Sequence, residues 1–155
     1  MEFIEKCLDA VQNLSKREKE YLKCKNDIVH FAENHFKVYG ASGKYEHIKL
    51  YPCQKGALYN FQSNNRFILN ATRQTGKTLI SMIFIAHSLI FNDNLTIAFI
   101  TQKIDNSAGV LQTLRYNLGK LLTTNNKLDL QLLNGSRLIF PFQQFRDYVI
   151  LRWTY

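Results

Sequence analysis

The chain has 155 residues, of which 46% are hydrophobic, and it contains only 7 Gly and 2 Pro. This composition excludes a disordered or low-complexity chain and predicts a folded unit long enough to bury a core. The formal net charge is +8, and residues 51–155 hold most of it, with 11 Lys and Arg against 4 Asp and Glu. A polyanion such as DNA or the phosphates of a nucleotide is therefore the expected kind of partner.

The first 44 residues predict a helical lead-in to the rest of the chain. Apolar residues recur every three or four positions and predict an amphipathic helix over residues 2–25. Its charged end, residues 15–25, is either a solvated helix face or an arm for nucleic acid. Asp27 is expected to cap a second short helix, with its apolar side formed by Ile28, Phe31, Ala32 and Phe36. A loop over residues 39–44 then separates the lead-in from residues 45–155.

The cysteines and histidines predict no metal site. The three Cys are odd in number and, with no signal peptide, are expected to be reduced cytosolic thiols; they are Cys7, Cys24 and Cys53. The four His, at positions 30, 35, 47 and 87, do not have the spacing of a metal-ligand motif. The longest apolar stretch, residues 79–91, is interrupted by polar residues and is too short to span a bilayer.

Gln54 is a candidate base-reading residue. Pro52 predicts the start of a helix, which places Gln54 in its first turn. The planar amide of Gln carries an acceptor and two donors, which match the N6/N7 edge of adenine. Alone, Gln54 would be an ordinary exposed helix residue. The loop that follows it, one helix and one strand later, favours an adenine contact.

Residues 67–79, FILNATRQTGKTL, are the most informative stretch of the chain. The apolar run at residues 67–69 predicts a buried strand, a polar turn follows, and a helix over residues 77–91 begins directly after Gly76. Strand, tight loop and helix in this order form a phosphate-binding loop, in which backbone amides and the helix N-terminus face a polyphosphate. Lys77 would reach the β- and γ-phosphates, and the Thr78 hydroxyl would hold Mg²⁺.

The loop departs from the usual G-x-x-x-x-G-K-[ST] pattern at one position. Ala71 stands where the first Gly belongs, and Ala does not readily adopt a positive φ. The alternative interpretation is that residues 76–78 simply begin a buried helix. The strand, loop and helix context favours a nucleotide-binding loop.

The remaining elements predict an α/β fold of P-loop NTPase type, a mostly parallel sheet flanked by helices. Residues 95–101 predict a buried parallel strand that ends in Thr101-Gln102-Lys103 at the ligand-binding edge. Asp105, Asn106 or Ser107 then caps a helix with one apolar stripe, formed by Val110, Leu111, Leu114, Leu118, Leu121 and Leu122. Residues 127–133 and 137–142 flank Asn134-Gly135, which predicts a hairpin. Alternating strands and helices imply right-handed crossovers.

The combination of YPCQ, ATRQTGKT, IAFITQK and LLNGSRLIF resembles the amino-terminal ATPase part of the large terminase subunits of tailed bacteriophages. These proteins are the motors that pump DNA into procapsids. The resemblance covers residues 26–140. That family often has [A/S]-x-R-Q-x-G-K-T at its loop, which accounts for Ala71. Asn134-Gly135-Ser136 resembles the turn that precedes the acidic strand of the family.

The resemblance implies roles for individual residues. ATP and Mg²⁺ would be bound by Gln54 and by the loop residues Ala71, Thr72, Arg73, Gln74, Thr75, Gly76, Lys77 and Thr78. Arg73 would swing to the γ-phosphate and trigger hydrolysis, or would tie the loop to its surroundings with its five-donor fork. The implied partners are double-stranded DNA, the portal, the small terminase subunit and further copies of the chain. The implied location is the cytoplasm of an infected or prophage-bearing bacterial host, with no membrane.

The acidic half of an ATPase site is missing from this sequence. In the resembled family, an apolar run ends in Asp-Glu, which hold the Mg²⁺ shell and orient the attacking water. The last glutamate here is Glu46, and no carboxylate after Thr78 follows an apolar run of four; these are Asp93, Asp105, Asp129 and Asp147. Asp147 instead precedes an apolar run, residues 148–151, that is predicted as a strand. The carboxylates of the family's nuclease domain are also absent.

We therefore expect a terminase ATPase domain that is truncated, binds ATP and hydrolyses it poorly. Three alternatives remain. A helicase-type ATPase shares the Gln-before-loop order and the basic charge. A small-molecule phosphotransferase is disfavoured by the roughly seventy residues before the loop, since such kinases usually place the loop near the amino terminus. A non-catalytic remnant would bind DNA or terminase partners.

Overall fold

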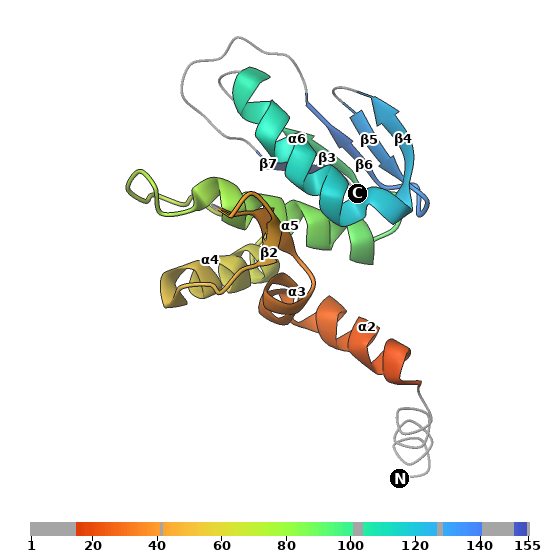
Figure 1. Cartoon of the computed structure of the whole chain (residues 1–155), viewed down its shortest axis with the longest axis horizontal. Helices are drawn as coiled ribbons and strands as arrows, with labels where there is room; N and C mark the ends of the chain where they lie inside the picture. The colour runs from red at the N-terminus through yellow and green to blue at the C-terminus, as the bar shows by residue number, and fades with distance from the viewer. Residues whose placement is uncertain (1–14, 41, 101–103, 127–128, 141–150, 155) are drawn as a thin grey trace.

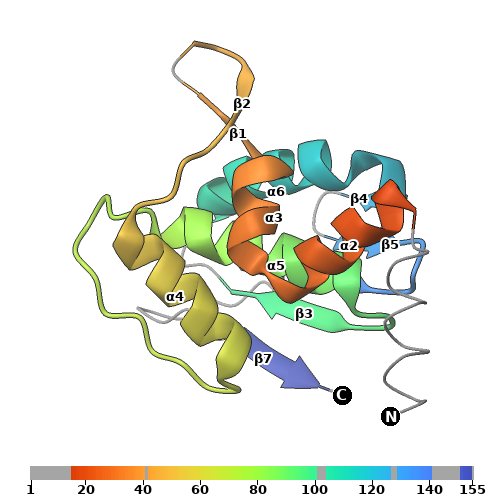
Figure 2. The same ribbon diagram turned by 90° about the horizontal axis from the view of Figure 1, so that it is seen from below.

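Helix α5 lies at the centre of the computed structural model, which describes residues 15–40, 42–100, 104–126, 129–140 and 151–154 (Figure 1). Helices α3 and α4 lie on one side of α5, and α6 and the larger sheet lie on the other (Figures 1 and 2). Because it is packed on both sides, most of the side chains of α5 are buried, including two polar ones. The helices are α2 (Lys16–Asn26), α3 (Ile28–Asn34), α4 (Pro52–Ser63), α5 (Lys77–Phe91) and α6 (Ile104–Leu118).

The helix boundaries follow the local signals of the sequence. As expected, Asp27 caps α3, because its Oδ1 accepts hydrogen bonds from the backbone N–H groups of Val29 and His30 at 2.9 and 3.0 Å. Pro52 begins α4, and α5 runs from Lys77 to Phe91 as expected. Residues 1–14, the first part of the predicted amino-terminal helix, lie outside the described residues.

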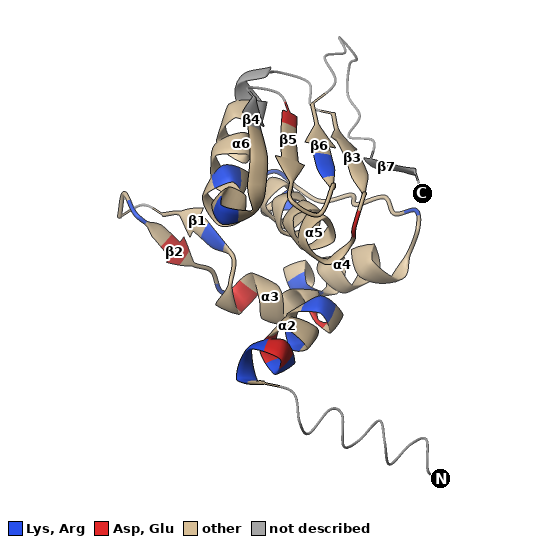
Figure 3. Ribbon diagram, turned by 90° about the vertical axis from the view of Figure 1, so that its right-hand side faces the viewer, with Lys and Arg blue, Asp and Glu red and all other residues tan. Residues whose placement is uncertain are grey.

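The charged run at residues 15–25 forms most of α2. Basic and acidic residues both lie on this helix (Figure 3), and Cys24 is its buried residue. The first turn is closed by a capping box, in which Ser15 and Glu18 each accept from the other's backbone N–H. This arrangement is a solvated helix with one contact face.

The loop expected over residues 39–44 connects two short strands, which were not predicted. Strands β1 (Lys37–Tyr39) and β2 (Tyr45–His47) pair antiparallel. The hairpin docks on α6, where the Tyr45 and Tyr116 rings stack with centroids 3.5 Å apart. Asn117 completes the contact by exchanging two 2.8 Å hydrogen bonds with the backbone of Lys37. Strands of three residues depend on such tertiary contacts, which the local sequence does not reveal.

The predicted mostly parallel sheet of P-loop NTPase type is wrong. The larger sheet has the order β4-β5-β6-β3-β7, and only the β3–β6 pair is parallel; the other three pairs are antiparallel. The strands are β3 (Thr96–Phe99), β4 (Leu122–Asn126), β5 (Asp129–Leu132), β6 (Arg137–Ile139) and β7 (Leu151–Thr154). The tight turn at Asn134-Gly135 makes the β5–β6 pair antiparallel, since a parallel pair needs a longer crossover.

The strand expected before the loop is also absent from the described structure. Residues 67–69 have no regular secondary structure, and the side chain of Ile68 is 92% exposed. The Phe67 ring makes an edge contact with Phe61 of α4, with centroids 5.0 Å apart. Phe67 therefore packs against α4, and no neighbouring strand pairs with residues 67–69 in the described sheet.

The predicted hairpin around Asn134-Gly135 is confirmed. β5 and β6 pair antiparallel, and Gly135 adopts φ +80° in the turn between them. The turn also holds the end of α5, because Asn134 Nδ2 donates to the backbone oxygens of Leu89 and Asn92 at 2.8 and 3.0 Å. Ser136 is fully buried, and its hydroxyl donates to Asn92 O at 2.7 Å.

One hydrophobic cluster contains residues from both sides of the expected boundary at residue 44. Phe31 of α3 packs edge-on against His87 and Phe91 of α5, with ring centroids 5.5 and 5.8 Å apart. The predicted stripe of α6 is buried at Val110, Leu111, Leu114 and Leu118. Leu121 instead lies in a 3₁₀ turn and is 38% exposed. Within the described ranges, none of the helices has both the length and the apolarity to cross a bilayer.

Candidate functional site

Lys77 lies where the loop that was predicted to bind phosphate meets α5. It is the first residue of α5, and its Nζ donates to the backbone oxygens of Ala71 and Thr72 at 2.7 and 2.5 Å. The loop therefore curls back over the ammonium group and holds it beside the N-terminus of α5. A cation next to free helix amides is the arrangement that attracts an anion such as a phosphate.

The backbone of the loop turns through two residues with positive φ. Gln74 has φ +63° and Gly76 has φ +82°. The Thr75 hydroxyl donates to Thr72 O at 2.9 Å and closes the turn. Left-handed residues beside ordinary ones turn successive N–H groups to one side, which produces a concave, anion-binding face.

The first turn of α5 retains its positive end. Its N-cap residue is Gly76, which has no side chain that could accept from the first backbone N–H groups of this helix. The first turn of this described helix also contains no Asp or Glu. The helix dipole is therefore not neutralised there, and it favours negative charge at the loop.

Gln54 connects α4 to the loop. Its side chain is only 7% exposed, so the interpretation as an ordinary exposed helix residue does not apply. Its Nε2 donates to Thr75 O at 3.0 Å, and its Oε1 accepts from the Tyr51 N–H at 3.0 Å. The amide thus links the first turn of α4 to the backbone of the loop. The adenine contact stays a prediction, and it would require this amide to exchange a protein partner for the base.

Arg73 and Thr78 are both exposed to solvent at the loop. Thr78 follows Lys77 in the first turn of α5, and Arg73 lies between Thr72 and the positive-φ residue Gln74. Their predicted roles, a γ-phosphate contact for Arg73 and a Mg²⁺ contact for Thr78, stay predictions. Thr101-Gln102-Lys103, expected at the ligand-binding edge of the sheet, lies outside the described residues.

The described carboxylates after Thr78 lie away from the loop or are paired. Asp93 follows the last residue of α5, so the length of this helix, roughly 22 Å for 15 residues, separates it from the loop. Asp129 forms an ion pair with Arg137 across β5 and β6, which lowers the pKa of this carboxyl. The side chain of Asp105 and the whole of Asp147 lie outside the described part of the chain. Neither Asp93 nor Asp129 therefore supplies the base that an ATPase needs.

A second group of polar side chains was not predicted from the sequence. Glu20 and Cys24 of α2 meet His30 of α3 and His35, the C-cap residue of α3, and their ligand atoms all lie within 4.8 Å of one another. Hydrogen bonds from His35 and His30 lower the pKa of Glu20 to about 2. The sequence did contain one signal for this group: Glu20 and Cys24 are four residues apart on one predicted helix, and two His follow. The pattern matches no common metal-ligand motif, because one member is a carboxylate and the residues come from two helices.

No protein-family model matches this sequence.

Proposed function

We propose that the loop of residues 71–78 binds the phosphates of ATP together with Mg²⁺. The observation that carries this proposal is the position of the Lys77 ammonium group, 2.7 Å from Ala71 O and next to the uncapped start of α5. The backbone carbonyls of Ala71 and Thr72 hold this cation in the structure. Phosphate oxygens bind an ammonium group more strongly than carbonyl oxygens do, so ATP would displace them.

The other loop residues have matching roles in the proposal. The amides around Gly76 and the first turn of α5 would donate to the β-phosphate, and the Thr78 hydroxyl would hold Mg²⁺. Arg73 is exposed and would reach the γ-phosphate. Gln54 supports the loop through Thr75 O, and it would also contact the adenine.

We further propose that the chain is the ATP-binding part of a phage large terminase subunit. The support for this is the ATRQTGKT loop, which resembles the family's loop at the position of Ala71. ATP-driven DNA translocation would belong to the full motor with its DNA and portal partners. The chain itself has no Asp-Glu pair after Thr78, so we expect it to bind ATP with little turnover.

The test is a titration of the folded chain with fluorescent ATP and Mg²⁺. Saturable binding is expected, and Lys77→Ala should weaken it by at least about 10-fold, because a charge-assisted hydrogen bond contributes roughly 1.5–3 kcal/mol. Lys120→Ala is the matched control, since it removes the same charge from an exposed side chain. Binding that is absent, or that Lys77→Ala and Lys120→Ala weaken equally, would overturn the proposal.

The same titration tests the base contact. If Gln54 reads adenine, GTP should bind less tightly than ATP, whereas inorganic triphosphate should keep the Lys77-dependent part of the affinity. Equal affinities for ATP and GTP would leave the phosphate site in place and remove the adenine role of Gln54.

A further inference from the structure

We propose that Glu20, Cys24, His30 and His35 form a zinc-binding site that joins α2 to α3. The four side chains supply one carboxylate oxygen, one sulfur and two imidazole nitrogens, and these atoms all lie within 4.8 Å of one another. The proposal is independent of ATP binding, since the cluster comes from the lead-in helices and not from the loop.

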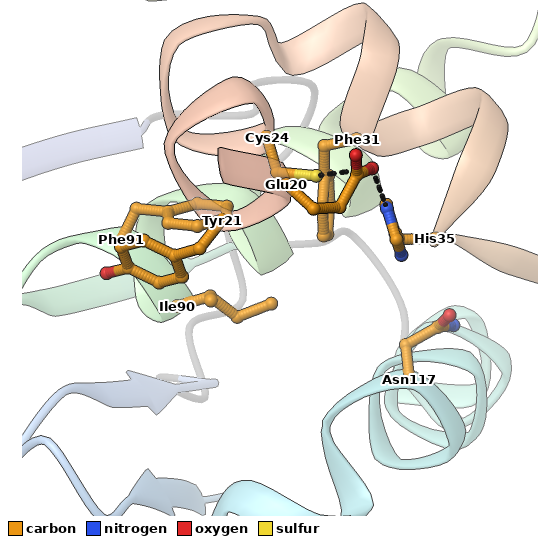
Figure 4. A pocket seen from close by; sticks show the side chains of 8 residues that line it. All are labelled: Glu20, Tyr21, Cys24, Phe31, His35, Ile90, Phe91 and Asn117. Atoms are coloured by element: carbon orange, nitrogen blue, oxygen red, sulfur yellow. Dashed lines mark hydrogen bonds and ion pairs between the residues drawn. The ribbon is translucent and has the colours of Figure 1, made fainter. Parts of the chain in front are cut away.

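The two helices bring the ligands together from opposite sides of Asp27. Glu20 and Cys24 are four residues apart on α2, so they lie on the same face of that helix. His30 is on α3, and His35 is its C-cap residue. Glu20 Oε1 lies 2.8 Å from His30 Nε2, 2.8 Å from His35 Nε2 and 3.8 Å from Cys24 Sγ. Figure 4 shows Glu20, Cys24 and His35 converging at one side of a cavity.

These separations are close to those of a tetrahedral zinc site. Zinc takes nitrogen and oxygen at about 2.0–2.2 Å and sulfur at about 2.3 Å, which places neighbouring ligand atoms roughly 3.3–3.8 Å apart. The Glu20–Cys24 separation already has this value. The two Glu20–His separations must widen by roughly half an ångström, which small rotations provide, because the Glu20 and His35 side chains are each 43% exposed.

The donor types select the metal class. One thiolate and two imidazoles bind zinc and related transition metals well, whereas Mg²⁺ and Ca²⁺ prefer oxygen ligands only. With four protein ligands, the site is of the closed kind that stabilises structure. It would fix the angle between α2 and α3 at the end of α2 where Cys24 O contacts His87 of α5, 2.9 Å from its Nε2.

The surroundings of the cluster also fit a bound metal. A cavity of about 300 Å³ adjoins it, with an apolar wall formed by Tyr21, Phe31, Ile90 and Phe91.

Without metal, the same group is a carboxylate that accepts a hydrogen bond from each of two imidazoles. That alternative needs no sulfur, whereas zinc binding requires Cys24. The two cases therefore differ in the role of one residue, and the chain contains matched control residues of both relevant types: Cys53 and His47 are exposed and lie outside the cluster.

The experiment titrates the reduced, chelator-treated chain with Zn²⁺, and in parallel with Co²⁺ as a spectroscopic probe. We expect one equivalent to bind and to raise the melting temperature, and the cobalt form to show a thiolate charge-transfer band with tetrahedral d–d bands. Cys24→Ser should abolish the thiolate band, and Cys53→Ser should retain it. His35→Gln, at an exposed position, should weaken Zn²⁺ binding by about 100-fold or more, and His47→Gln should not.

Three results would overturn the proposal. They are the lack of saturable binding at one equivalent, a thiolate band that persists in Cys24→Ser, and equal Zn²⁺ affinities for His35→Gln and His47→Gln. Because Cys24 is buried, the fold of Cys24→Ser is checked by circular dichroism. If that variant does not fold, the exposed pair His35→Gln and His47→Gln decides the question.

Discussion

Gly76 is the residue on which the backbone of the phosphate-binding loop depends. Its φ of +82° lies in the left-handed region, which L side chains rarely adopt. A Cβ built on Gly76 would lie 2.6 Å from Gln54 Nε2, and this nitrogen is the donor that holds Thr75 O. A side chain at Gly76 would therefore strain the turn and also displace the amide that supports it.

We predict that Gly76→Ala lowers the free energy of unfolding by about 1–2 kcal/mol, the usual cost of an L residue in this conformation. It should also abolish the ATP binding proposed above, because the loop amides would no longer point to one side. Urea denaturation and the ATP titration measure the two effects.

Gly56→Ala is the matched control for this substitution. Gly56 lies inside α4, and a Cβ there meets nothing within 4 Å, so Ala should raise the free energy of unfolding by about 0.5–1 kcal/mol and leave ATP binding unchanged. If Gly76→Ala binds ATP as tightly as the natural chain does, the loop conformation is not what creates the site.

At the scale of elements, the helices were predictable because their signals are local. Asp27, Pro52 and Gly76 each begin a helix where the sequence places them, since a cap, a preset φ and a left-handed turn act over three or four residues. The Asn134-Gly135 turn similarly predicted its hairpin. In the candidate site, the positions of Gly76, Lys77 and Thr78 at the start of α5 followed from the same local pattern.

Strand pairing and contacts between helices were not predictable in this way. The apolar run at residues 67–69 was interpreted as a strand, but a strand needs a neighbour for its backbone hydrogen bonds, and Ile68 is 92% exposed. The bond from Gln54 to Thr75 O joins residues 21 positions apart. The cluster around Glu20 was missed because its ligands come from two helices whose relative angle the sequence does not state.

The burial of His87 of α5 beside α2 makes the stability of the chain depend on pH. This side chain is 6% exposed, its Nε2 lies 2.9 Å from Cys24 O, and burial lowers its pKa below the ordinary value of 6.5. The unfolded chain therefore binds a proton at a higher pH than the folded chain does. The contribution of neutral, buried His87 to stability is therefore fully present above about pH 6.5. It decreases as the pH falls below that value, by at most about 1.4 kcal/mol per pH unit for one proton.

We predict that His87→Gln makes the stability of the chain less dependent on pH between about 6.5 and 5, since Gln keeps an N–H donor for Cys24 O and does not titrate. Urea denaturation at several pH values measures this slope. Glu20 loses its contribution at lower pH, below 4.5 and toward about 2, so it does not confuse the comparison. An unchanged slope in His87→Gln would show that other groups cause the acid sensitivity; His47→Gln, at an exposed position, is the control.

At the scale of the whole molecule, the lead-in helices and the sheet share one core. Phe31 of α3 contacts His87 and Phe91 of α5, and α5 in turn lies between α3 and the sheet (Figure 1). Polar contacts cross the same boundary, since Glu33 accepts from the Leu50 N–H at 3.0 Å and pairs with Lys55 at 2.8 Å. A core that is continuous across residue 44 predicts cooperative unfolding of the two parts.

We therefore predict one unfolding transition for the whole chain. Far-UV circular dichroism reports mainly on the helices, and the single tryptophan, Trp153, is on β7 opposite Ile97 of β3. Both signals should change at the same urea concentration.

The variant Phe31→Ala should move both transitions to lower urea together. It should lower the free energy of unfolding by about 3–5 kcal/mol, because it leaves a cavity against α5. Leu22→Ala, at a 40% exposed position of α2, should shift neither by more than about 0.5 kcal/mol. A Trp153 transition that stays in place when Phe31→Ala moves the dichroism signal would mean that the lead-in helices unfold separately, and that the loop at residues 39–44 is a domain boundary despite the shared core.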